Sequence, residues 1–117
     1  MSNDILRQLE YVGVDTDAAL TRLVRNERLY KKILYGFLSD TNFKELEKSI
    51  AKRDYKNALF SAHTLKGISG NLGMEPLFGK LEELVKKMYD NDFGDVDQLF
   101  LQISAIYHSI YTVIEKI

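Results

Sequence analysis

The chain of 117 residues has no cysteine, no tryptophan and a single proline. Without cysteine there can be no disulfide framework, no thiolate nucleophile and no cysteine-ligated metal. The two histidines are too few for the closed nitrogen and sulfur shell of a structural zinc ion, so we predict no metal site. The scarcity of proline leaves few points at which a helix is forced to stop.

A strong excess of charge of either sign is also missing, because 16 Lys and Arg residues oppose 17 Asp and Glu residues. This balance argues against the basic surface of a nucleic-acid-binding protein. No apolar run approaches the ~20 residues that a membrane span requires. The charged segment Met1–Glu10 lacks the apolar stretch of a signal peptide. We therefore expect a soluble, cytoplasmic protein with neither a nucleic-acid nor a membrane partner.

Apolar residues make up 45% of the chain. They recur at intervals of three and four rather than two, which is typical of amphipathic helices. Residues able to cap a helix precede several of these apolar segments; they are Asp15, Asn26, Asp54 and Asp95. Residues 1–14, which end near the helix-breaking Gly13, are expected to form a loosely ordered lead-in.

The expected fold class is all-α. A break is predicted over residues 39–42, although one long kinked helix across it is an alternative. Gly73 suits the position just after the helix that begins at Asp54, and Pro76 suits the first turn of the next helix. Such short connections favour an antiparallel four-helix bundle with a short additional N-terminal helix. We assign this bundle, as one domain, to residues 15–117.

The helix expected between Asp54 and Gly73 carries the most informative residues. With about 100° of rotation per residue, its small and aliphatic side chains gather on the side opposite His63. That opposite side is formed by Ala58, Ser61, Leu65, Ile68, Ser69 and Leu72. His63 is therefore predicted to face solvent.

Three residues share the face of His63, at i+3, i+4 and i+7, namely Lys66, Gly67 and Gly70. A glycine inside a helix costs about 1 kcal/mol relative to alanine, and these two do not lie on the predicted inward side. A bulky side chain at i+4 would lean back over the imidazole, so Gly67 is predicted to keep access open. Lys66 is placed to stabilise a phosphoryl group on the ring. A kink, or contact with an N-terminal helix, is the alternative explanation of the glycines.

Apolar side chains flank this face. Leu59 and Phe60 lie at its edges and are predicted to form a docking patch for another protein, extended by Gly70 and Lys56. Packing of the two apolar residues against the first helix is an equally good alternative, and a solvated charge is the simpler explanation of Lys56. His108 has no neighbouring glycines, and we expect it to be an ordinary surface residue.

The run HTLKGISGNLG, from His63 to Gly73, resembles the motif of histidine phosphotransfer (HPt) domains. In that motif a histidine is followed by x-Leu-Lys-Gly-x-Ser, and a glycine ends the helix. Arg53-Asp54-Tyr55 before the helix and Leu81-Glu82 after it extend the resemblance, which covers most of the chain. Gly79 departs from the family pattern, so the residues across from His63 stay unassigned.

The resemblance implies four main helices and a phosphorylated His63. It implies that Lys66 stabilises the phosphoryl group and that Gly67 keeps the site open. It implies a monomer whose partners are receiver domains of response regulators and hybrid sensor histidine kinases, and it implies no cofactor. The sequence also lacks a GxxxxGK[ST] phosphate loop. The chain would therefore be a phosphocarrier rather than an enzyme with its own nucleotide site.

Two other functions remain open. A helical adaptor could bind receiver domains or helices without being phosphorylated, and it would need Leu59 and Phe60 but not His63. An enzyme that uses His63 as a general base would need a carboxylate to orient the ring and a concave pocket. The predicted face of His63 offers neither.

Overall fold

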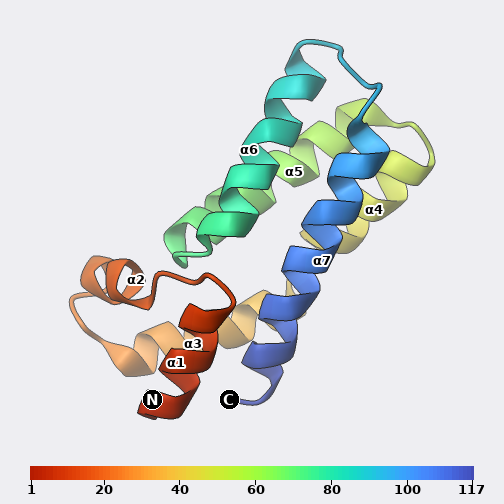
Figure 1. Ribbon diagram of the computed structural model, residues 1–117. Coiled ribbons are helices and arrows are strands. Elements are labelled where there is room, and N and C mark those ends of the chain that lie inside the picture. Colours follow the sequence, from red (N-terminus) through yellow and green to blue (C-terminus); the bar gives the residue numbers. More distant parts are fainter.

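The computed structural model describes the whole chain, Met1–Ile117, and consists of helices and loops (Figure 1). One isolated antiparallel backbone bridge joins Val14 to Met74, and there is no β-strand. The seven helices are α1 (Asn3–Tyr11), α2 (Thr16–Arg22), α3 (Glu27–Ser39), α4 (Asn42–Ala51), α5 (Tyr55–Asn71), α6 (Glu75–Tyr89) and α7 (Val96–Glu115). The all-α fold class is therefore confirmed.

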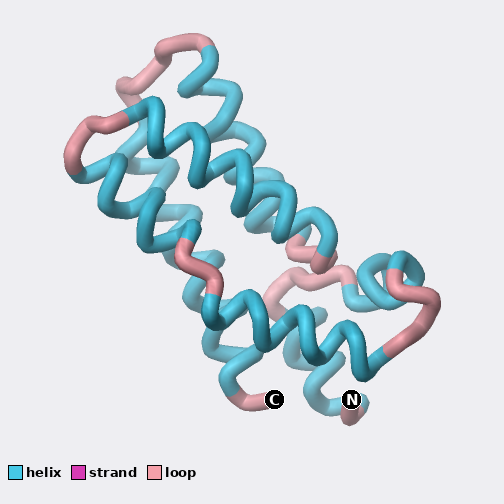
Figure 2. The backbone as a smooth tube through the Cα atoms, turned by 180° about the vertical axis from the view of Figure 1, so that it is seen from behind, coloured by secondary structure: helices cyan, strands magenta, loops and turns pink.

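The molecule is elongated, with extents of 42 × 23 × 21 Å. At one end α4, α5, α6 and α7 follow in chain order, and α5, α6 and α7 each turn back along the helix before it (Figures 1 and 2). At the other end α1 and α3 pack against the C-terminal part of α7, and α2 lies against α1 and α3. Because α7 contacts α1, α3, α4 and α6, it connects the two ends of the molecule.

Both chain termini lie close together at the α1–α3 end (Figures 1 and 2). The amino group of Met1 lies 3.6 Å from the carboxylate of Glu27. The hydroxyl of Tyr35 donates a hydrogen bond of 2.7 Å to the backbone oxygen of Ile117. Glu27 and Tyr35 both belong to α3, so this one helix anchors both ends of the chain.

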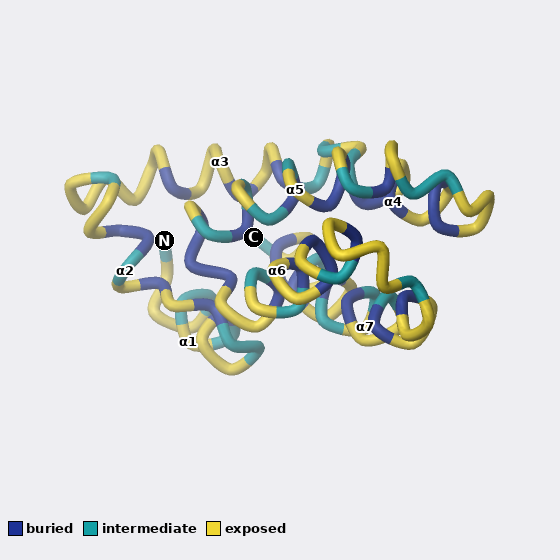
Figure 3. Tube along the Cα trace, turned by 90° about the horizontal axis from the view of Figure 1, so that it is seen from above, coloured by how far each residue is buried: buried dark blue, intermediate teal, exposed yellow.

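A single cluster of 27 buried apolar residues forms the core, on the inward sides of the helices (Figure 3). Each fully buried aliphatic side chain contributes roughly 1.5–3 kcal/mol. α7 supplies large side chains along its whole length: Val96, Leu99, Ile103, Tyr107, Ile110, Val113 and Ile114. α5 instead buries Ala58 and Ala62, together with Ser61 and Ser69, and small side chains let neighbouring helices approach closely.

The predicted helix starts at Asp15, Asn26 and Asp54 are confirmed. In each case the side-chain oxygen accepts a hydrogen bond from the backbone N–H three residues onward, at 3.0, 3.0 and 3.3 Å respectively. Such a cap contributes about 1 kcal/mol. Asp95 precedes α7 as predicted but makes no capping hydrogen bond. Its carboxylate lies 3.2 Å from the ammonium of Lys87.

The predicted break over residues 39–42 is also confirmed, with two separate helices there rather than one kinked helix. α3 ends at Ser39 and α4 begins at Asn42. Between them the carboxylate of Asp40 accepts hydrogen bonds from the backbone N–H and the side-chain amide of Asn42, at 2.8 and 3.0 Å. This local turn ends α3 and starts α4 with Phe43 buried in the core.

The prediction that residues 1–14 form a loosely ordered lead-in is wrong for residues 3–11, which form α1. The hydroxyl of Ser2 caps this helix by accepting a hydrogen bond of 3.2 Å from the N–H of Ile5. Ile5 and Leu9, one turn apart, pack on the core, and α1 contacts α7. The fold therefore has two N-terminal helices, α1 and α2, where the sequence pattern predicts one.

The loop between α1 and α2 pairs with the turn between α5 and α6. The N–H of Asp15 donates a hydrogen bond of 2.6 Å to the carbonyl of Gly73, beside the Val14–Met74 bridge. Gly73 has a φ of +74°, as predicted for a residue just after a helix. A Cβ at this position would clash with the carbonyl of Asp15. The N-terminal segment therefore braces the chain immediately after α5.

Candidate functional site

α5 carries the candidate residues, and its two sides differ as the sequence predicts. Its buried residues are Ala58, Ser61, Ala62, Leu65 and Ser69. His63 and Gly67 are exposed on the other side. α5 is also capped at its first turn and followed by the braced Gly73, so the exposed residues stand on a helix fixed at both ends.

The imidazole of His63 is free of intramolecular partners. The side chain is exposed, and it makes no hydrogen bond or salt bridge within the chain. Its neighbour Thr64 directs its hydroxyl back to the carbonyl of Phe60 at 3.0 Å, a bond within the helix. Both ring nitrogens of His63 are therefore available to solvent or to another molecule.

The space around Gly67 is open, as predicted. A Cβ placed on Gly67 would meet no heavy atom within 4 Å outside its own helix backbone. Neither a kink nor a helix contact accounts for this glycine, because α5 continues through it to Asn71. The absent side chain leaves bare helix surface one turn beyond His63.

Gly70 differs from Gly67, and the expectation that no close packing explains it is wrong. A Cβ on Gly70 would lie 3.1 and 3.2 Å from two ring carbons of Phe78 on α6. The glycine is half-buried, and its carbonyl accepts a hydrogen bond of 2.8 Å from the guanidinium of Arg22. Gly70 therefore serves the packing of α6 and α2 against the end of α5.

The ammonium of Lys66 lies near an aromatic ring and not near a carboxylate. Its nitrogen is 5.9 Å from the ring centroid of Phe78, within the ~6 Å range of cation–π attraction. Lys66 is half-buried and forms no salt bridge. Its positive charge is therefore not neutralised by any acidic group of the chain.

The two apolar residues proposed for docking have different surroundings. Leu59 is partly buried against the core, so part of its role is structural. Phe60 is 72% exposed, which excludes packing against a first helix as its explanation. It borders a largely polar groove between α4 and α5, whose other lining residues are Thr41, Asn42, Glu45, Lys48, Ser49, Lys52, Asp54, Asn57 and Ser61.

Lys56 is exposed and forms no salt bridge, which fits either a docking residue or a solvated charge. Phe78 and Arg22 are the neighbours of this face that the sequence pattern does not reveal. Phe78 sits on the α6 stretch that the HPt resemblance leaves unassigned, and Arg22 reaches α5 from a helix distant in sequence. Only the tertiary packing brings these two residues to Gly70.

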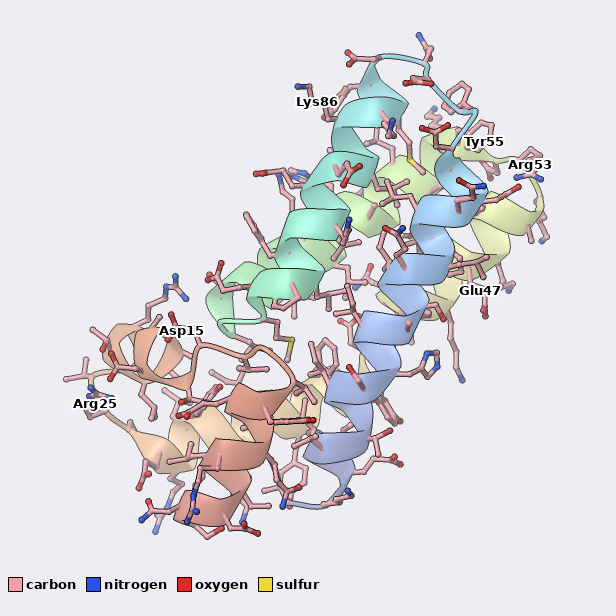
Figure 4. The ribbon with its side chains drawn as sticks, viewed as in Figure 1. Asp15, Arg25, Glu47, Arg53, Tyr55 and Lys86 are labelled. Carbon is pink, nitrogen blue, oxygen red and sulfur yellow. The ribbon has the colours of Figure 1, made fainter.

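The run Arg53-Asp54-Tyr55 lies at the turn between α4 and α5, where Figure 4 shows Arg53 and Tyr55. The guanidinium of Arg53 donates hydrogen bonds of 2.6 and 2.8 Å to Asp97. These bonds raise the pKa of Arg53 and lower the pKa of Asp97. The ring of Tyr55 stacks on Phe93 with centroids 4.0 Å apart. The run therefore ties α4 and α5 to the start of α7, away from His63.

No group of three or more His, Asp or Glu side chains is placed to hold a metal ion. None of the seven helices combines the length and the apolar character that a membrane span requires.

In comparisons with known proteins, the chain matched no family model, no curated protein and no solved structure.

Proposed function

We propose that this protein is a histidine phosphotransfer (HPt) protein, which relays a phosphoryl group between receiver-domain aspartates through phospho-His63. The observation that carries the proposal is the exposed imidazole of His63, free of intramolecular partners and followed one turn later by the open surface at Gly67. A nucleophile that reacts inside another protein's site needs this unobstructed approach. The motif from His63 to Gly73 supports the same function.

The packing of α4, α5, α6 and α7 supports the four-helix bundle that the HPt resemblance implies. The last three of these helices each turn back along the preceding one, and α4 also contacts α7, which closes the group. In this interpretation residues 15–117 form the HPt domain and α2 is the short additional helix. α1 and α3 then extend one end of the bundle.

The proposed transfer needs a nucleophile and charge neutralisation but no nucleotide. The lone pair of the neutral His63 ring attacks the phosphorus of a receiver's aspartyl phosphate. A P–N bond forms as the P–O bond breaks, and its electron pair returns to the aspartate carboxylate. Exchange with a second receiver reverses these steps and regenerates free His63. The receiver contributes the acidic pocket and its Mg²⁺, so this chain is a phosphocarrier.

Lys66 and Gly67 would assist this step in different ways. The unpaired ammonium of Lys66 is available to the two or so negative charges that a phosphoryl group brings. The missing side chain at Gly67 lets the receiver's backbone approach the ring. The proposed partners are the receiver domains of response regulators and of hybrid sensor kinases. The proposed chain is a monomer that binds them in the cytoplasm.

The exposed ring of Phe60 beside the α4–α5 groove supports receiver docking next to His63. The same observation favours the second candidate, an adaptor that binds receivers without being phosphorylated. The two candidates differ in whether a covalent bond to His63 forms.

The test is to mix the purified chain with a phosphorylated receiver and to follow the label by intact mass and by acid lability. We expect acid-labile label on the wild-type chain and on His108→Gln, and none on His63→Gln. Binding of the receiver should survive in His63→Gln. Binding without any label on the wild-type chain would support the adaptor instead, and label that persists in His63→Gln would overturn the assignment of His63.

A further inference from the structure

The ammonium of Lys66 lies near a ring that packs on α5 one turn after Lys66. Helical side chains lean towards the N-terminus, which here would bring the ammonium of Lys66 towards His63, one turn earlier. Instead the nitrogen lies over the ring of Phe78. That ring covers Gly70, which is one turn later than Lys66. The ammonium is therefore drawn away from His63, towards the C-terminal end of α5.

The contact between Phe78 and Gly70 explains how this ring is held there. Two ring carbons of Phe78 lie 3.1 and 3.2 Å from the position of a Gly70 Cβ, so only glycine leaves the ring its present place. Phe78 is half-buried on α6, with Leu77 and Leu81 on either side of it fully buried. The backbone of α6 thus fixes the ring, while the long side chain of Lys66 is free to move.

An aromatic ring attracts an ammonium without neutralising it. A carboxylate in the same place would hold the charge more strongly and would repel an incoming phosphoryl group. The attraction of an ammonium to a ring at a solvent-accessible site is weak. The two negative charges of a phosphoryl group on His63 offer a stronger partner within one helical turn.

We propose that Phe78 provides a resting position for the ammonium of Lys66, which Lys66 leaves for the phosphoryl group when His63 is phosphorylated. This inference rests on the proposed function for its biological meaning, although the movement itself needs only a phosphorylated His63. Because the ammonium of Lys66 gives up its contact with the ring, this movement slightly disfavours the phosphorylation of His63. Phe78 therefore tunes how readily the carrier passes its phosphoryl group on.

The movement can be followed by NMR without any receiver. The methylene protons of Lys66 should be shifted upfield by the ring current of Phe78 in the free protein, and this shift should be lost in Phe78→Leu. Phosphorylation of His63 with phosphoramidate should remove the shift in the wild-type chain. Phe93→Leu, which removes a half-buried ring at the far end of α5, should leave it unchanged. A shift that persists on phospho-His63 would overturn the inference.

The energetic consequence can be measured as the ratio of phospho-His63 to phospho-receiver at equilibrium. Phe78→Leu should raise this ratio roughly two- to fivefold, the equivalent of one exposed cation–π contact. Phe78→Tyr should keep the wild-type ratio. In a Lys66→Ala background Phe78→Leu should have no effect, because the ring acts only through Lys66. An equal change in that background would contradict the inference.

The two measurements separate this inference from the proposed function. If receivers transfer nothing but phosphoramidate still releases Lys66 from the ring, the relay function fails and the resting position stands. If phosphoramidate leaves His63 unmodified, the resting position fails as well. Gly70→Ala, which crowds the ring without removing it, serves as a second variant should Phe78→Leu unfold, and it should move the ratio in the same direction by a smaller factor.

Discussion

The two histidines of this chain lie on the outer sides of different helices, and they differ in what surrounds them. On α5, His63 has no hydrogen-bond partner and an open surface one turn onward. On α7, Nδ1 of His108 lies 2.8 Å from the carbonyl of Ser104. Its ring also stands edge-on to Phe43 and Tyr107, with centroids 5.3 and 5.4 Å apart.

Both rings are exposed, so exposure alone does not distinguish a reactive histidine from a structural one. The distinction lies in the contacts of the ring. The contacts of His108 contribute to the packing of α4 against α7. The ring of His63 makes no such contact, and Gly67 beside it lowers stability relative to alanine. A glycine that lowers stability without a packing reason is consistent with the proposed access of a receiver to His63.

The largest difference between the two histidine faces is expected in the rate of phosphoryl transfer, when a long side chain is placed over each ring. Gly67→Gln places a long side chain at i+4 from His63, where it leans back over the imidazole. We expect the rate of phosphoryl transfer from a receiver to fall roughly ten- to a hundredfold. Thr112→Gln places the same side chain at i+4 from His108 and should leave the rate unaltered. Equal rates for the wild-type chain and Gly67→Gln would show that the open surface has no role in access.

A second effect separates the two glycines on α5. Gly67→Ala should raise the free energy of unfolding by about 1 kcal/mol, because alanine favours the helix and the new Cβ meets only open space. Gly70→Ala should gain less or lose stability, since Phe78 must shift to make room. Urea unfolding of both variants measures these free energies. A gain at Gly70 equal to that at Gly67 would mean that Phe78 does not pack on Gly70.

A similar or smaller effect should distinguish the histidines themselves. His108→Ala should lower the free energy of unfolding by about 0.5–1 kcal/mol, through loss of the edge-on contacts with Phe43 and Tyr107. His63→Ala should be neutral or stabilising by up to about 0.5 kcal/mol, since the ring packs on nothing and alanine favours the helix. Equal losses at both positions would contradict the comparison.

The last effect concerns pH on the His108 side. Burial, with the nearby Tyr111 and Asp40, raises the pKa of Tyr107 to about 12. The unfolded chain ionises this phenol near pH ~10. The stability linked to the neutral phenol is therefore present below pH ~10 and is lost as the pH rises towards ~12. Between pH ~9 and ~11 the urea midpoint of Tyr107→Phe should therefore fall less than that of the wild-type chain. Part of the fall should remain, because burial also raises the pKa of Tyr30.

Much of the fold follows from local rules that the sequence states directly. Asp15, Asn26 and Asp54 cap helices with their own side chains, and Gly73 takes the left-handed backbone that ends α5. The outward direction of His63 follows from helical periodicity alone. These features depend on residues within one or two turns of each other, so no knowledge of packing is needed to predict them.

The features that the sequence does not reveal depend on how helices meet. α1 is short and rich in polar residues, and its stability comes from burying Leu9 against the rest of the core. The role of Gly70 depends on the register that brings Phe78 of α6 over it. The partial burial of Leu59 likewise depends on packing between helices. Periodicity places a residue on a face but does not say which neighbour covers that face.

The anchoring of both termini on α3 has a practical consequence for reagents. A fluorophore or affinity handle attached to either end would emerge beside Glu27 or Tyr35, at the opposite end of the molecule from the α4–α5 and α6–α7 turns. A donor and an acceptor dye placed at the two ends would therefore start within a short distance of one another. Loss of their energy transfer would report the detachment of α1 or of the last turn of α7 while the surface around His63 stayed unlabelled.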